Sequence, residues 1–158
     1  MKTKWRLAAS IGVPVVVGGI LGTIATKNAK GEYQSLQKPS FSPPSWVFPV
    51  TWTTLYTTMG IAKYQFDKQN KTDTLQRRVN TAYGTQLGLN YLWPFLFFRW
   101  NMRGTAFIEA TLLWSAVTLN TYYFNKRSKL ACSLMIPYIS WLTYALRLNY
   151  RTWQLNKN

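Results

Sequence analysis

One stripe of aromatic and amide side chains is the part of the sequence best suited to binding a ligand. Tyr83, Gln86, Asn90, Trp93 and Phe97 follow one another at intervals of 3, 4, 3 and 4 residues, so in a helix they share one face. Amides supply a few directional hydrogen bonds and aromatic rings supply contact area, as in pockets for apolar ligands. The alternative is structural, because Gln and Asn also hydrogen-bond neighbouring helices within membranes.

Two tryptophans near a proline pair form a second group. Pro43 and Pro44 suit the start of a helix, where a missing N–H costs little. Trp46 would then lie at a membrane–water boundary, either as an interfacial anchor or as part of a pocket. Trp52 lies two turns deeper, with Tyr56 following at helical spacing, and is expected to face other helices.

The C-terminal part of the chain adds another aromatic face and one isolated acid. Glu109 is the sole acid after Asp73. Within a membrane helix it is either functional, paired with Arg99 or Arg103, or close enough to the helix end to reach the interface. The small side chain of one residue on the aromatic face leaves room for a ligand or a close helix. That face comprises Tyr138, Trp141, Ala145 and Leu148.

The composition argues against several kinds of chemistry. The chain of 158 residues has no histidine, one cysteine and four acids, whereas metal sites and acid–base catalysis draw mostly on those residue types. We therefore expect no metal site and no catalytic residues. Haem could not be held through imidazole, so any tetrapyrrole would bind by stacking, apolar burial and hydrogen bonds. The formal charge of +15 does not indicate a nucleic-acid partner, because the charges are segregated along the chain.

Long stretches without charge predict the fold. Each can supply about 20 mainly apolar residues, the length that crosses a bilayer, and short basic segments separate them. Soluble helices would instead carry charges on their outer faces. The mean hydropathy of -0.14 is low because Trp, Tyr and Thr lower the average. We predict a single all-α domain, residues 1–158, that is an integral membrane bundle of five transmembrane helices at about 6–26, 45–66, 79–98, 104–125 and 130–153.

The first of these segments has an alternative interpretation as a secretory signal peptide, because basic residues precede an apolar stretch. A retained helix is favoured, since the stretch is long for a signal peptide and Gly18 and Gly22 have the spacing that allows close helix packing. Pro14 is tolerable in a membrane helix and predicts a kink. The basic residues give only a weak bias, which places the N-terminus on the cytoplasmic side of a plasma membrane.

Taken in order, these motifs resemble those of the translocator protein family (TspO, or tryptophan-rich sensory protein). The resemblance covers nearly the whole chain and is clearest from Lys38 to Asn149. The pieces that carry it are Lys38-Pro39, Pro43-Pro44-Ser-Trp46-Val-Phe48, Trp52-Thr-Thr-Leu-Tyr56, Met59-Gly60, Gln86-Leu-Gly-Leu-Asn90-Tyr-Leu-Trp93, Phe97-Phe98, Pro137-Tyr138-Ile-Ser-Trp141 and Ala145-Leu-Arg-Leu148-Asn149-Tyr150.

The resemblance implies a five-helix bundle, usually dimeric, whose ligand cavity is capped by the loop between the first two helices. Family members bind porphyrins, and eukaryotic members also bind cholesterol. No cofactor is required, and a porphyrin such as protoporphyrin IX or haem would be the ligand. The expected binding residues, from the motifs and the helical faces together, are Trp46, Trp52, Tyr56, Gln86, Asn90, Trp93, Trp141, Ala145 and Leu148.

The sequence leaves three functions open. The favoured one is a membrane receptor or transport-type protein for porphyrins, with sterols or other lipophilic ligands as further candidates. The second is an enzyme that degrades porphyrin with light and oxygen, and the third is a structural membrane partner without a ligand. Phe41 stands where many family members have Trp, and Thr105 stands where animal members have a pocket Trp. Arg151 directly follows Tyr150, which weakens the family's cholesterol pattern. The membrane would be a bacterial cell envelope or, in a eukaryote, the mitochondrial outer membrane.

Overall fold

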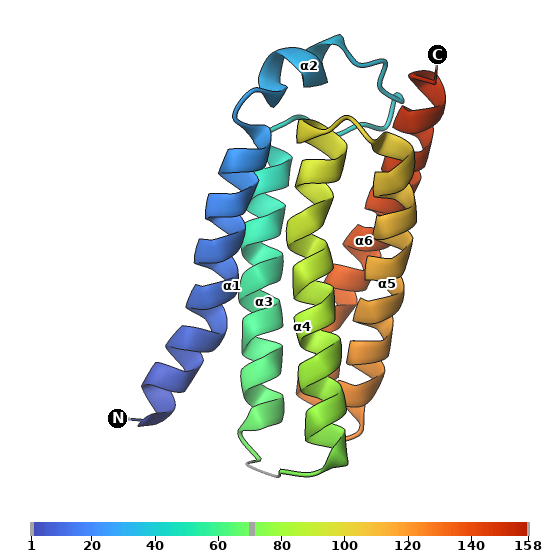
Figure 1. Cartoon of the computed structure of the whole chain (residues 1–158). Coiled ribbons are helices and arrows are strands. Elements are labelled where there is room, and N and C mark those ends of the chain that lie inside the picture. The colour runs from blue at the N-terminus through green and yellow to red at the C-terminus, as the bar shows by residue number, and fades with distance from the viewer. Residues whose placement is uncertain (1, 70–71, 158) are drawn as a thin grey trace.

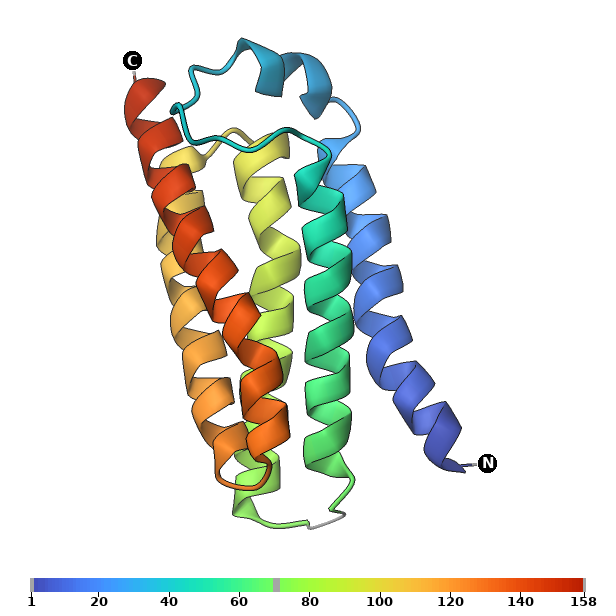
Figure 2. The same cartoon turned by 180° about the vertical axis from the view of Figure 1, so that it is seen from behind.

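The computed structural model describes residues 2–69 and 72–157, and within them it is all-α. Five long helices run side by side, and a short helix lies across one end of the bundle (Figures 1 and 2). The chain begins at the end of the bundle opposite the short helix, and it ends at the same end of the bundle as the short helix. The elements are α1 (Lys2–Thr26), α2 (Ala29–Ser35), α3 (Val47–Asp67), α4 (Thr74–Pro94), the π-helical turn η1 (Phe95–Arg99), α5 (Arg103–Asn125) and α6 (Lys129–Leu155).

The predicted fold class is confirmed, and two details differ from the sequence expectation. The third long helix begins at Thr74 rather than near 79, because the carboxylate of Asp73 caps it by accepting from the backbone N–H of Gln76 at 2.8 Å. The uncharged stretch begins only after Arg77 and Arg78, which lie within the first turns of the helix, so it does not predict these turns. The helix α2 was not predicted, and it lies in the connection between α1 and α3.

The outward faces of the long helices are apolar. Along the part of the chain that the structure describes, α1 is the one helix that passes a simple test of length and hydropathy for a membrane span, over Lys4–Thr26. The other long helices fail that test because they carry polar and aromatic residues, several of them buried. Their exposed positions nevertheless match a lipid environment. Exposed aliphatic residues include Val13, Val16, Ile20, Ile24, Val50, Ile108, Leu112, Leu119 and Ile136.

Helix α1 packs closely against α3 through two glycines. Pro14 has no N–H, so the carbonyl of Ser10 lacks its usual helical partner, and Gly60 of α3 lies directly against that carbonyl. Nearer to α2, the ring of Tyr56 lies over Gly18, where an added Cβ would be 2.7 Å from Cζ. Gly22 was expected to allow close packing as well, but open space surrounds it.

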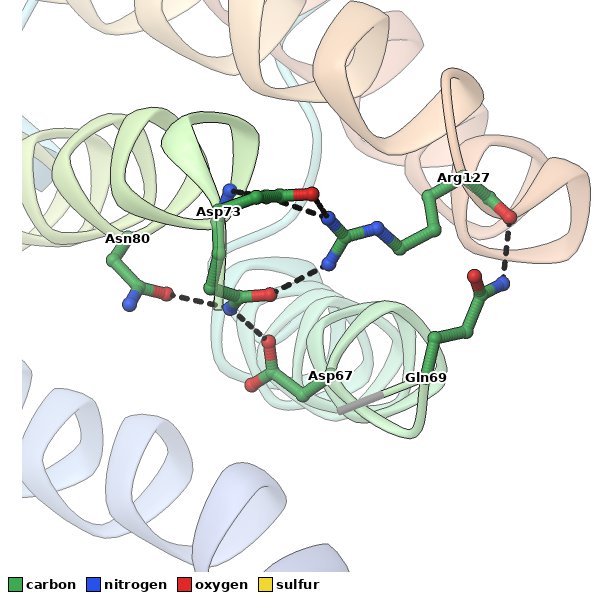
Figure 3. A network of polar contacts seen from close by, with 6 residues as sticks. Asp67, Gln69, Asp73, Asn80 and Arg127 are labelled. Carbon is green, nitrogen blue, oxygen red and sulfur yellow. Dashed lines mark hydrogen bonds and ion pairs between the residues drawn. The ribbon is translucent and has the colours of Figure 1, made fainter. Parts of the chain in front are cut away.

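A polar network fastens the end of the bundle that carries the N-terminus (Figure 3). Arg127, between α5 and α6, donates to both carboxylate oxygens of Asp73 at 2.8 and 2.7 Å and to Oε1 of Gln76 at 2.8 Å. Nε2 of Gln76 donates in turn to Asp67 at 2.6 Å. The backbone carbonyl of Arg127 accepts from Gln69 at 2.8 Å. These bonds join the ends of α3 and α4 to the α5–α6 connection.

The contact between α1 and α3 predicts an unfavourable effect of Gly60→Ala. The added methyl group would overlap the Ser10 carbonyl and lie 2.8 Å from the Cα of Ile11, so the helices must separate. Forcing such overpacking costs roughly 1–3 kcal/mol, and we expect a clearly lowered Tm in detergent. Gly19→Ala is the matched control, because an added Cβ there meets nothing within 4 Å. Equal Tm values for the two variants would contradict this packing.

Candidate ligand cavity

The amide of Asn90 joins three helices in the middle of the bundle. Its Oδ1 accepts from the hydroxyl of Tyr56 on α3 at 2.9 Å, and its Nδ2 donates to the hydroxyl of Tyr138 on α6. One turn away, Nε2 of Gln86 donates to the sulfur of Met59 at 3.0 Å. All five side chains are buried. This geometry matches the interhelical role that the sequence left open for Gln86 and Asn90.

Above this polar layer, toward α2, aromatic side chains from five elements surround a cavity. Its volume is about 20 Å³, measured as the space open to the centre of a water-sized sphere, so it has room for about one water. The lining residues come from α2, α3, α4, η1 and α6. They are Tyr33, Phe48, Trp52, Trp93, Phe97, Phe98, Trp141, Ala145, Leu148, Asn149 and Thr152.

The π-helical turn η1 contributes two consecutive phenylalanines to this lining. Pro94 cannot donate a helical hydrogen bond, and after it the backbone N–H of Trp100 bonds to the carbonyl of Phe95, five residues back, at 2.8 Å. Phe97 stacks on Trp93 with ring centroids 4.9 Å apart, and Phe98 meets Phe97 edge-on at 4.8 Å. Such π turns recur at functional sites because they redirect side chains.

Two tryptophans of the lining differ in how their indole N–H is used. Nε1 of Trp93 donates to Oδ1 of Asn149 at 3.0 Å, while Nδ2 of Asn149 donates to the carbonyl of Arg103 at 2.9 Å. Nε1 of Trp141 is buried and has no hydrogen-bond partner among the described residues. A buried donor without a partner is costly, so Trp141 has an unused hydrogen bond to offer.

The connection between α1 and α3 covers the cavity, as the family resemblance implies. Tyr33 of α2 touches Phe48 and Phe98, each with a centroid distance of 6.0 Å. Polar bonds hold the cover at its margins: Tyr144 donates to the carbonyl of Phe41 at 2.7 Å. The side chain of Asn156 accepts from the backbone N–H of Gln37 at 3.1 Å and donates to its carbonyl at 2.9 Å. The amide of Asn101 donates to the carboxylate of Glu32.

The structure divides the nine expected binding residues into three groups. Those around the cavity are Trp52, Trp93, Trp141, Ala145 and Leu148. Three others, Tyr56, Gln86 and Asn90, lie in the buried polar layer instead. Trp46 lies outside the lining and is 66% exposed, because it is the residue that precedes the first turn of α3; this position corresponds to its alternative interpretation as an interfacial anchor.

Glu109 has neither of the arginine partners considered for it. Arg99 donates to the carbonyl of Ile24 at 3.3 Å, and Arg103 donates to Asn101 at 2.9 Å. Glu109 is 6% exposed, and within the described part of the chain neither of its carboxylate oxygens has a hydrogen-bond partner. It does not line the cavity.

Several lining residues are not among the nine expected binding residues. Four of them belong to the motifs that carry the family resemblance, namely Phe48, Phe97, Phe98 and Asn149. Phe97 also lies on the predicted stripe, so its helical spacing could have identified it. Asn149 pairs with Trp93 across 56 positions of sequence, which no single helical face reveals. Tyr33 and Thr152 lie outside those motifs.

The bundle of five long helices, with apolar outer faces and a capped aromatic cavity, is typical of a polytopic membrane protein. Comparison with known proteins makes the assignment specific: a model described as the TspO/MBR family matches residues 10–154. The chain therefore belongs to the TspO/MBR family, and the resemblance inferred from the sequence is confirmed.

Relatives come from animals and bacteria. The chain is 35% identical to the translocator protein of Ovis aries over 162 aligned positions, which cover 99% of this chain and 94% of that protein. It is 35% identical to the tryptophan-rich protein TspO of Chlorobaculum tepidum, with 95% of each chain covered. Identity to the tryptophan-rich sensory protein of Cereibacter sphaeroides is 30%, covering 100% of this chain and 96% of that protein.

The separation of polar layer and cavity predicts different effects for two variants. Asn90→Ala leaves the buried hydroxyls of Tyr56 and Tyr138 without their amide partner, at a cost of about 1–3 kcal/mol per group, and we expect a markedly lower Tm. Trp141→Phe removes a donor that has no partner among the described residues, so its Tm should stay close to that of the wild type. Thermal unfolding in detergent measures both. The reverse order of stabilities would contradict the assignment of Asn90 to the polar layer.

Proposed function

We propose that the protein is a membrane receptor or transport-type protein that binds a porphyrin in the aromatic cavity, with sterols and other lipophilic compounds as competing ligands. The observation that carries the proposal is the unpartnered N–H of Trp141 in a lining made almost entirely of aromatic and aliphatic groups. Such a site suits a flat apolar ligand with polar edges, since rings supply contact area and a few donors fix orientation.

Binding requires the cover to move. Ligand pockets occupy roughly 300–1,000 Å³, whereas the cavity measures about 20 Å³. Among the lining side chains, Tyr33 lies on the cover and Phe48 lies at the first turn of α3, so we expect these two to move. Displacing them breaks edge-on ring contacts but leaves the Asn90 layer intact. A porphyrin would replace those contacts by stacking on Trp141 and Trp93.

The proposal is tested by titrating the detergent-purified protein with protoporphyrin IX in the dark and following the porphyrin's Soret absorbance. We expect saturable binding that Trp141→Phe weakens by about tenfold, the value of one hydrogen bond of roughly 1.5 kcal/mol. Ala145→Leu, which fills the lining, should abolish it. Cholesterol added as a competitor tests whether sterols occupy the same cavity.

The control is Trp5→Phe, which removes a tryptophan that is 73% exposed on α1, far from the cavity lining. It should bind porphyrin as the wild type does. Spectral changes that never saturate, or that are identical in all variants, would reject the cavity as the porphyrin site. Illumination of the complex separates binding from catalysis. Loss of no more than one porphyrin per protein supports a receptor, and continued turnover would establish the enzyme instead.

We also propose that the protein is a homodimer, as the resemblance implies. Light scattering of the detergent-purified protein tests this proposal. We expect the protein mass of two chains, and the mass of a single chain would overturn the proposal.

The membrane in which the protein resides follows from the family, whose members occur in bacteria and in mitochondria. We propose the cell envelope in a bacterial host and the mitochondrial outer membrane in a eukaryotic one.

A further inference from the structure

A second hollow lies on the outside of the bundle, between α4 and α5, at the end that carries the N-terminus. These helices lie side by side (Figure 1), and the hollow between them has a volume of about 400 Å³. Two arginines stand at its outer end, and hydroxyl, methyl and aliphatic groups continue it inward. The lining consists of Thr74, Arg77, Arg78, Thr81, Ala82, Thr85, Ala116, Leu119 and Tyr123. We call it the α4–α5 groove.

The groove carries two positive charges that no ion pair among residues 2–69 and 72–157 engages. Arg77 and Arg78 form no ion pair or side-chain hydrogen bond with any described residue, and no acid lines the groove. The two acids nearest in sequence are engaged elsewhere. Asp73 holds Arg127, and Asp67 holds Lys63 and Gln76, as the network in Figure 3 shows in part. An anionic group is the natural complement.

The distance that the groove extends into the membrane indicates the kind of anion that it binds. Thr85 lies seven residues after Arg78 along α4, which is about 10 Å at 1.5 Å per residue, and thus well inside the hydrocarbon when the arginines are at headgroup level. Leu119 and Ala116 line the groove from α5. A soluble phosphate has no reason to extend along such a surface, whereas an acyl chain does. Basic pockets between membrane helices bind anionic headgroups.

We propose that the α4–α5 groove binds one anionic phospholipid, with its phosphate between Arg77 and Arg78 and an acyl chain along Thr85, Ala116 and Leu119. The guanidinium groups donate to phosphate oxygens, a pairing that arginine favours by its planar geometry. The site is separate from the aromatic cavity, since the two share no lining residue. It does not depend on whether that cavity takes a porphyrin.

Native mass spectrometry of the full chain in detergent tests the proposal, with phosphatidylglycerol and phosphatidylcholine of identical acyl chains as probes. We expect one phosphatidylglycerol per protomer to be retained with an affinity about tenfold or more above that of phosphatidylcholine, because each basic residue at the headgroup level contributes measurably. Arg77→Gln with Arg78→Gln should remove the preference. Both side chains are exposed, and circular dichroism checks that this variant keeps its helices.

The matched control is Lys68→Gln with Lys129→Gln, which removes two charges from the same end of the bundle outside the groove. It should keep the preference for phosphatidylglycerol. Equal loss in both double variants would show a diffuse surface attraction and overturn the site. An unchanged preference in the arginine variant would overturn it too. Displacement of the lipid by millimolar glycerol 3-phosphate would identify a soluble-anion site instead, whereas resistance to it supports a lipid held by headgroup and chain together.

Discussion

The hydrogen bonds of Asn90 are the interaction on which the rest of the bundle depends. Lipid provides no hydrophobic force between helices, because their apolar surfaces are equally well solvated by acyl chains. Helices must therefore be selected by close packing and by polar groups that have nowhere else to bond. Asn90 links α4 to Tyr56 on α3 and to Tyr138 on α6. The ring of Tyr56 also lies over Gly18, so the same layer helps to locate α1.

The aromatic cavity follows from this layer. Once α3, α4 and α6 are joined in the middle of the bundle, the residues one or two turns nearer to α2 on each helix are brought together. Trp52 on α3, Trp93 on α4 and Trp141 on α6 meet in this way. The pair formed by Trp93 and Asn149 adds a second bond between α4 and α6 at the level of the cavity. Buried hydrogen bonds therefore hold the layer of Asn90 together, whereas the cover is held by ring contacts and by polar bonds at its edges.

Much of the fold could be predicted from the sequence, because charge-free length is a direct physical requirement of spanning a bilayer. The site was harder. Periodicity placed Gln86, Asn90 and Trp93 on one face of α4, and all three do point inward. It could not tell that the first two lie below the cavity and the third beside it. Depth depends on which residue of a neighbouring helix lies opposite, and that information is not contained in the spacing of one helix.

The distribution of polarity explains why the average hydropathy misrepresents this chain. Hydrophobic groups such as Ile108 and Leu112 are outside, whereas amides such as Asn120 and Asn149 are buried. In water this arrangement would expose a large apolar surface and would be unstable. In lipid it is favourable, because the outer face needs no hydrogen bonds and each buried amide can find a partner within the bundle. The polar residues that lower the hydropathy average thus include those that hold the membrane helices together. The exposed cations lie at the two ends of the bundle, where headgroups and water can solvate them.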